Sequence, residues 1–228
     1  PNRRCKMTDT AKTQSQTKSK KRVADHGEVF TAEREVKAML DLVKIQSQQI
    51  GSRFLEPACG TGNFLAEILT RKLATVLAKS QINKSQKSPK YSQSHYERDA
   101  IWAISSIYGI ELLADNVSEC RSRLLALFET HYQTHFKHIN PAVMDVAHFL
   151  LSKNIVHGDA LTLKDDDGHA IVFSEWTFVG DIRINRRDFV YENLVEKVDN
   201  ASPIDKGFIA KPIEEYPPIH FLNLFEQG

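Results

Sequence analysis

Residues 53–69 read RFLEPACGTGNFLAEIL, and this stretch decides the predicted fold. Residues 54–56 are a short, mainly apolar segment typical of a strand. A turn of small residues follows, with Gly60 and Gly62 beside Cys59. Apolar residues then recur at helical spacing. A strand, a glycine turn and a helix in this order indicate a loop whose backbone approaches a ligand closely.

The remaining chain alternates predicted helices with short apolar strands. This alternation predicts an α/β fold with a mostly parallel sheet, in which ligands bind at the carboxyl ends of the strands. The further strands are expected at 107–112, 154–157 and 170–179, and the main helices at 31–43, 64–73, 97–105, 115–128 and 141–151.

Composition divides the chain into three parts. Residues 1–25 are polar and basic and are expected to be disordered. Residues 26–178 carry the predicted ligand-binding domain, with an exposed polar insertion at 79–95. Residues 179–228 are expected to form an irregular, proline-rich extension that ends in an apolar anchor, with a strand end and a short helix within residues 184–198. Arg186 and Arg187 in this extension are interpreted as part of a solvated face.

Bulk properties exclude some classes of function. No apolar run reaches the ~20 residues of a membrane span. The three cysteines show no metal-binding spacing, so no metal site is predicted, and a cytoplasmic location is expected. Beyond residue 22, the chain has 22 basic and 28 acidic residues, a net charge of −6. That part lacks the basic surface of a free-standing DNA reader, so other surfaces would have to help hold DNA.

Charge at the glycine turn indicates the type of ligand. The phosphate-binding pattern G-x-x-x-x-G-K-[ST] is absent, and the dinucleotide pattern G-x-G-x-x-G fails at Leu65. Glu56 ends the first strand, where its carboxylate would repel a phosphate and attract an amino group or a sulfonium. The turn therefore favours S-adenosylmethionine. Glu111 and Asp159, at the ends of the next two strands, can accept from ribose hydroxyls and from an adenine amine.

Two segments resemble a known family. "FLEPACGTGNFL" (54–65) is similar to the cofactor loop of S-adenosylmethionine-dependent DNA adenine methyltransferases, especially the modification subunits of restriction–modification systems. "GEVFTAEREV" (27–36) resembles the segment that closes over the methionine end of the cofactor in that family, in the order of its gamma group. The cofactor-binding residues implied are Phe30, Thr31, Glu56, Pro57, Ala58, Gly60, Gly62, Asn63, Phe64, Glu111, Leu112, Asp159 and Ala160.

The resemblance also implies a fold and a reaction. The fold would be a class I methyltransferase (Rossmann-like) domain, incomplete at its C-terminal side, and the reaction methylation of adenine N6 in DNA. The family positions the base with Asn/Asp-Pro-Pro-Tyr/Phe after the fourth strand, and this tetrapeptide is absent here. Glu175 and Trp176 stand in its place as weak catalytic candidates. The alternative is that Trp176 is a core residue and Glu175 a strand-end acid.

Three functional readings stay open. The chain is a DNA methyltransferase that needs a catalytic or specificity partner, a non-catalytic regulatory or assembly subunit that binds S-adenosylmethionine, or a methyltransferase for a non-DNA substrate. A nucleotide-dependent dehydrogenase is disfavoured by Glu56.

Overall fold

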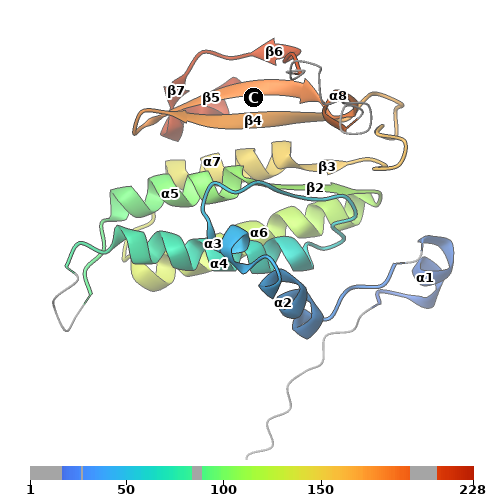
Figure 1. The fold of residues 1–228 in the computed structure, drawn as a ribbon, viewed down its shortest axis with the longest axis horizontal. Helices are drawn as coiled ribbons and strands as arrows, with labels where there is room; N and C mark the ends of the chain where they lie inside the picture. The colour runs from blue at the N-terminus through green and yellow to red at the C-terminus, as the bar shows by residue number, and fades with distance from the viewer. Residues whose placement is uncertain (1–16, 27, 84–88, 196–209) are drawn as a thin grey trace, which may run out of the picture.

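The computed structural model describes residues 17–26, 28–83, 89–195 and 210–228 (Figure 1). Most of the tail expected to be disordered, and the middle of the expected insertion at 79–95, therefore lie outside the described residues. The helices are α1 (Lys20–His26), α2 (Glu33–Asp41), α3 (Lys44–Gln48), α4 (Asn63–Ser80), α5 (Gln93–Ser105), α6 (Ala114–His135), α7 (Pro141–Asn154), α8 (Glu192–Val195) and the 3-10 helix η1 (Phe221–Gln227). The strands are β1 (Phe54–Glu56), β2 (Ile107–Glu111), β3 (Ile155–His157), β4 (Val172–Val179), β5 (Arg183–Val190), β6 (Glu214–Glu215) and β7 (Ile219–His220).

A three-stranded parallel sheet with the order β1-β2-β3 forms the centre of the domain. Leu55 pairs with Tyr108, and Glu111 pairs with His157, so the carboxyl ends of the three strands lie at one edge. Figure 1 shows helices α5 and α7 leading directly into β2 and β3. The mixed α/β class predicted from the sequence is confirmed.

Helical periodicity determines the packing around this sheet. In α6 the buried residues Val117, Cys120, Leu124 and Phe128 recur every three or four positions, which places them on one face. Helix α6 packs against α4 and α7, and α4 also packs against α5 and β2. The side chains of these helices form one continuous apolar core with β2 and β3.

The predicted fourth parallel strand is wrong. Strand β4 pairs antiparallel with β5, and both belong to a separate sheet that also contains β6 and β7. The reason is the turn at residues 180–182, where Gly180 has a φ of +66° and reverses the chain. Only β1, β2 and β3 form the parallel sheet of the described chain.

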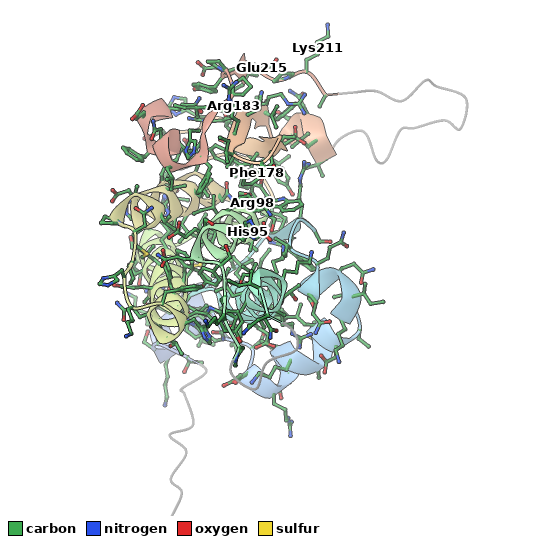
Figure 2. All side chains as sticks on the ribbon, turned by 90° about the vertical axis from the view of Figure 1, so that its left-hand side faces the viewer. His95, Arg98, Phe178, Arg183, Lys211 and Glu215 are labelled. Carbon is green, nitrogen blue, oxygen red and sulfur yellow. The ribbon has the colours of Figure 1, made fainter. Side chains whose placement is uncertain are left out.

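The β4–β5 hairpin is joined to the central sheet by a hydrogen bond and to α5 by ionic and aromatic contacts. Tyr108 of β2 donates a hydrogen bond of 3.0 Å to the carbonyl of Ser174 in β4. At the turn, Arg98 of α5 lies 3.7 Å from Asp181. Figure 2 shows Arg98 near Phe178 of the hairpin. Phe178 in turn contacts Trp102 of α5, with ring centroids 5.8 Å apart.

The two chain ends contain more structure than their sequences indicate. Residues 20–26 form α1, where disorder was expected, because Lys18 and Arg22 pair with acidic residues of α6. Within the C-terminal part expected to be irregular, β5 is eight residues long. Arg186 is buried on this strand, contrary to the solvated face expected, because it pairs with Asp188 at 2.8 Å.

The apolar anchor expected at the C-terminal end is present. Phe221 and Leu224 of η1 are buried, and η1 packs on α7. No helix of the described residues is long and apolar enough to cross a membrane.

Candidate functional site

A cavity of about 540 Å³ lies at the carboxyl ends of β1, β2 and β3. Glu56 ends β1, Glu111 ends β2, and Asp159 follows β3 by two residues. All three line the cavity. Parallel pairing thus brings together acids from three distant parts of the sequence, as the sequence predicted.

The glycine turn forms one wall of this cavity. Gly60 and Gly62 have φ values of +52° and +83°, which favour glycine. A side chain at Gly60 would lie 3.1 Å from Phe30, which also lines the cavity. The turn is held to β2 because the Cys59 N–H donates to the Ile110 carbonyl at 3.0 Å.

Gly62 has a packing role instead of a place in the cavity. A Cβ atom there would lie 2.6 Å from Sγ of Cys120, so α6 packs directly against the turn. Gly62 does not line the cavity, whereas the other twelve predicted cofactor-binding residues do. The geometric reason is that the turn presents Gly60 to the cavity and Gly62 to α6.

Glu111 supports the glycine turn from the next strand. Its Oε2 accepts from the Gly60 N–H at 2.8 Å, and its Oε1 accepts from the Leu113 N–H at 3.0 Å and from Nδ2 of Asn116 at 3.2 Å. A carboxylate offers about four acceptor positions, so about one is left for a ligand. Glu111 is 8% exposed. Its first role in the structure is to fix the turn.

Glu56 differs from Glu111 in its hydrogen bonds: Glu111 accepts from three groups of the chain, whereas Glu56 accepts from the backbone N–H of Ala58, and neither carboxylate forms an ion pair with a described residue. Burial raises the pKa of Glu56, and the backbone N–H of Ala58 offsets this effect only in part. A half-buried carboxylate without a counter-charge favours a cationic ligand.

Asp159 has one oxygen engaged within the chain. Its Oδ1 accepts from the Leu161 N–H at 2.8 Å. Oδ2 has no hydrogen bond to the described residues and can accept from a ligand amine. Behind it, a Cβ atom at Gly158 would lie 2.8 Å from Ile171, so the chain passes closely beneath the cavity.

The segment before α2 closes the cavity on the side of the helices. Phe30 and Thr31 both line the cavity. The Asn63 side chain, at the start of α4, donates to the Thr31 carbonyl at 2.9 Å and so joins this segment to the glycine turn. Ala32 occupies the N-cap position of α2, and no side-chain hydrogen bond from Ala32 or Thr31 caps this helix.

Sequence reasoning missed several residues of the cavity. Two of them are polar: Glu28, which begins the described part of the closing segment, and Asn116 in the first turns of α6. Glu28 lies in the predicted closing segment, and Asn116 follows the predicted strand at 107–112. These positions could have indicated that both residues line the cavity. The complete missed set is Glu28, Val29, Cys59, Leu113, Asn116, Gly158 and Leu161.

The weak catalytic candidates lie elsewhere. Trp176 is 5% exposed, and its Nε1 donates to Oδ1 of Asn154 at 2.8 Å. Glu175 pairs with Arg53 at 2.6 Å and with Arg187. Trp176 as a base-stacking residue is therefore wrong, because the inner face of the hairpin buries it. Neither residue lines the cavity.

One group of side chains in the described residues has the spacing of a metal site: Asp165, Asp167 and His169. Oδ1 of Asp165 accepts from the backbone N–H groups of Asp167 and His169, at 3.0 and 2.8 Å. These hydrogen bonds form a turn, and the turn explains why the three side chains lie close together.

Comparison with known families gives one match. The family model described as MmeI, DNA-methyltransferase domain, matches residues 26–171, which is more than half of the 228 residues. The match includes the closing segment, the glycine turn and all three parallel strands, and it ends one residue before β4. The chain has no significant match among curated proteins or solved structures.

Proposed function

The chain belongs to the family of the MmeI DNA-methyltransferase domain, and we propose that its cavity binds S-adenosylmethionine for methyl transfer to DNA. Family membership supports a DNA methyltransferase of the restriction–modification type. The proposal adds the cofactor, the class I (Rossmann-like) fold and adenine N6 as the acceptor.

The charge of the cavity carries the proposal. Four carboxylates line it, those of Glu28, Glu56, Glu111 and Asp159, of which Glu28 pairs with Arg22, and the lining residues include no lysine, arginine or histidine. A dinucleotide or a nucleoside triphosphate would bring phosphates into this negative field, at a cost in free energy. S-adenosylmethionine has a sulfonium, an ammonium group and no phosphate, so its charge complements the lining.

Each acid suits a different part of the cofactor. Glu56, without a counter-charge, would accept from the ammonium group. Glu111 would use its remaining acceptor position for a ribose hydroxyl while it holds Gly60. Asp159 would accept from the adenine amine through Oδ2. The other proposed contacts come from apolar or backbone groups of Phe30, Thr31, Pro57, Ala58, Gly60, Asn63, Phe64, Leu112 and Ala160.

Methylation needs a second site that positions the target base. S-adenosylmethionine, held by Glu56, Glu111 and Asp159, would supply the methyl group for adenine N6, and the proton released from N6 would pass to solvent. The sequence contains no Asn/Asp-Pro-Pro-Tyr/Phe segment, and the hairpin buries Trp176. We therefore assign base positioning and much of DNA binding to a partner chain or a further segment.

Calorimetric titration tests cofactor binding and its charge preference. The wild-type chain should bind S-adenosylmethionine more tightly than ATP or NAD. Glu56→Gln removes the unpaired charge with little change in shape, and it should weaken binding about 10- to 100-fold, because a hydrogen bond to a charged group contributes about 1.5–3 kcal/mol.

Glu129→Gln is the matched control, since Glu129 is an exposed carboxylate of α6 outside the cavity lining. It should leave the affinity unchanged. Preference for ATP, or equal losses in both variants, would refute the assignment of the cavity. Transfer of radiolabelled methyl groups to mixed-sequence DNA by the chain alone would refute the need for a partner.

A further inference from the structure

The N-terminal segment is joined to the cavity by a continuous series of polar contacts. We propose that Arg22 is a positioning residue for the cofactor site, acting on the Gly60 amide through Glu28, Asn116 and Glu111. We call these five residues the Arg22 relay. The inference rests on the proposed function for its effect on the cofactor, but the relay itself can be tested without the cofactor.

Arg22 joins two elements that are distant in sequence. Its Nε and one terminal nitrogen donate to the two oxygens of Glu28, at 2.6 and 2.8 Å. Its two terminal nitrogens also donate to Asp115 at the start of α6, at 2.6 and 3.1 Å. The planar guanidinium can serve two carboxylates in this way, whereas a lysine ammonium cannot reproduce the same fork.

Asn116 carries the contact into the interior. Its Nδ2 donates to Oε1 of Glu28 at 2.6 Å and to Oε1 of Glu111 at 3.2 Å. Its Oδ1 accepts from Lys18 at 2.7 Å. Asn116 is 1% exposed, so a lost partner would leave a buried polar group unsatisfied. Its amide is therefore held in one orientation by groups from three parts of the chain.

Glu28 and Asp115 are held in their ionised forms. Burial acts to raise the pKa of Glu28, but hydrogen bonds from Arg22 and Asn116 outweigh burial and lower this pKa. The hydrogen bond from Arg22 is the main cause that lowers the pKa of Asp115 to about 2, with a further contribution from Lys18. Glu28 and Asp115 therefore keep their charges at pH values near neutrality.

The relay ends at the ligand-binding wall. Glu111 accepts from the Gly60 N–H, and Phe30, two residues after Glu28, lies against Gly60. Fixing Glu28 therefore restrains the closing segment, and fixing Glu111 restrains the turn. Loss of Arg22 should loosen both walls of the cavity and leave the core of α4, α5 and α7 intact.

The test compares Arg22→Gln with Arg34→Gln. Arg34 is a matched control because it lies near the same segment, is exposed, and pairs only with its neighbour Glu35 among the described contacts. Arg22→Gln should weaken S-adenosylmethionine binding about tenfold, as expected for loss of a charge-assisted pair. Arg22→Lys should restore part of the affinity, and Arg34→Gln should have no effect.

Salt tests whether the effect of Arg22 on affinity is electrostatic. Because the Arg22 contacts are partly exposed, the difference in affinity between wild type and Arg22→Gln should shrink as NaCl rises from about 0.05 M to about 1 M. Asp115→Asn weakens the α6 side of the contact without touching the cavity lining, and it should lower the affinity less than Arg22→Gln does, because the two hydrogen bonds from Arg22 to Glu28 remain.

Amide hydrogen exchange tests the relay without cofactor. The Gly60 amide should exchange about tenfold faster in Arg22→Gln than in wild type, while core amides of α4 should keep their protection. Unchanged Gly60 exchange and affinity, or equal effects of Arg34→Gln, would overturn the relay. If the wild type fails to bind S-adenosylmethionine while Gly60 exchange still depends on Arg22, the proposed function fails and the relay stands.

Discussion

Replacing Glu111 with glutamine tests how this carboxylate holds the glycine turn. In the native chain it accepts from Gly60 N–H, Leu113 N–H and Asn116 Nδ2, at 2.8, 3.0 and 3.2 Å. A glutamine has one acceptor oxygen, so its NH₂ group must face at least one of these donors. In the less costly orientation, only the Gly60 N–H loses its acceptor. Loss of a charged acceptor by a buried N–H costs about 1.5–3 kcal/mol.

Urea unfolding monitored by circular dichroism measures this cost. Glu111→Gln should lower the free energy of unfolding by about 1.5–3 kcal/mol, and the melting temperature by about 3–10 °C for a chain of this size. Glu129→Gln should change the free energy by less than about 0.5 kcal/mol, as exposed substitutions usually do. Equal stability of the two variants would refute a structural role for Glu111. If Glu111→Gln destabilises the glycine turn as expected, Glu56→Gln is the clearer test of cofactor contact, because it does not remove a hydrogen bond that holds the turn.

The remaining predictions concern charge and packing. Burial raises the pKa of Glu56 above the ordinary 4.5, so wild-type affinity for S-adenosylmethionine, titrated from pH 8 downward, should fall as pH drops through this raised pKa, whereas that of Glu56→Gln should stay level. Burial lowers the pKa of Lys72 from 10.5 to about 7, so the unfolded chain binds more protons between these values. In denaturant titrations, the free energy of unfolding of wild type minus that of Lys72→Met should therefore rise by about 2 kcal/mol between about pH 7 and 9. A difference that does not change with pH would contradict the lowered pKa of Lys72. Gly62→Ala should lower the free energy of unfolding by about 2–4 kcal/mol in the same assay, because of backbone strain and a clash with Sγ of Cys120. Adding Cys120→Ala removes only the clash and should recover about 1 kcal/mol of this loss. If the effects of the two substitutions are strictly additive, the contact between the new Cβ atom and Sγ is excluded.

Local patterns predicted the part of the site that depends on chain order. A strand followed by a glycine turn and a helix positions Glu56 and Gly60, and parallel pairing brings Glu111 and Asp159 to the same edge. Apolar spacing likewise predicted a helix at 115–128, which lies within α6. These features could be read from the sequence because each depends on spacing along one segment or on one pairing rule.

Non-local contacts explain what the sequence did not show. The segment around Trp176 looks like a further parallel strand, but the turn at Gly180 pairs it with β5. Arg186 is buried because Tyr216 lies against its guanidinium, 4.3 Å from the ring centroid, and Asp188 neutralises its charge. Such partners come from separate segments, so burial of a charged residue is not visible in its own neighbourhood.

The polar residues around the cavity show the same limit. Nothing in the sequence around Asn116 indicates that its side chain links Glu28 to Glu111. Glu111 reads as a ribose ligand, yet it first satisfies the backbone of the glycine turn. Side-chain orientation across three segments decides these roles, and the sequence does not contain it.

Site-resolved nuclear magnetic resonance tests the central claim most directly, which is that S-adenosylmethionine binds at the carboxyl ends of β1, β2 and β3. Amide resonances of the ¹⁵N-labelled chain are followed as the cofactor is added. The resonances of Gly60 and Gly158, beside the cavity, should shift and saturate together, while that of Gly180 in the hairpin turn should stay fixed. Saturable shifts centred on the hairpin, or no shifts at millimolar cofactor, would contradict the account.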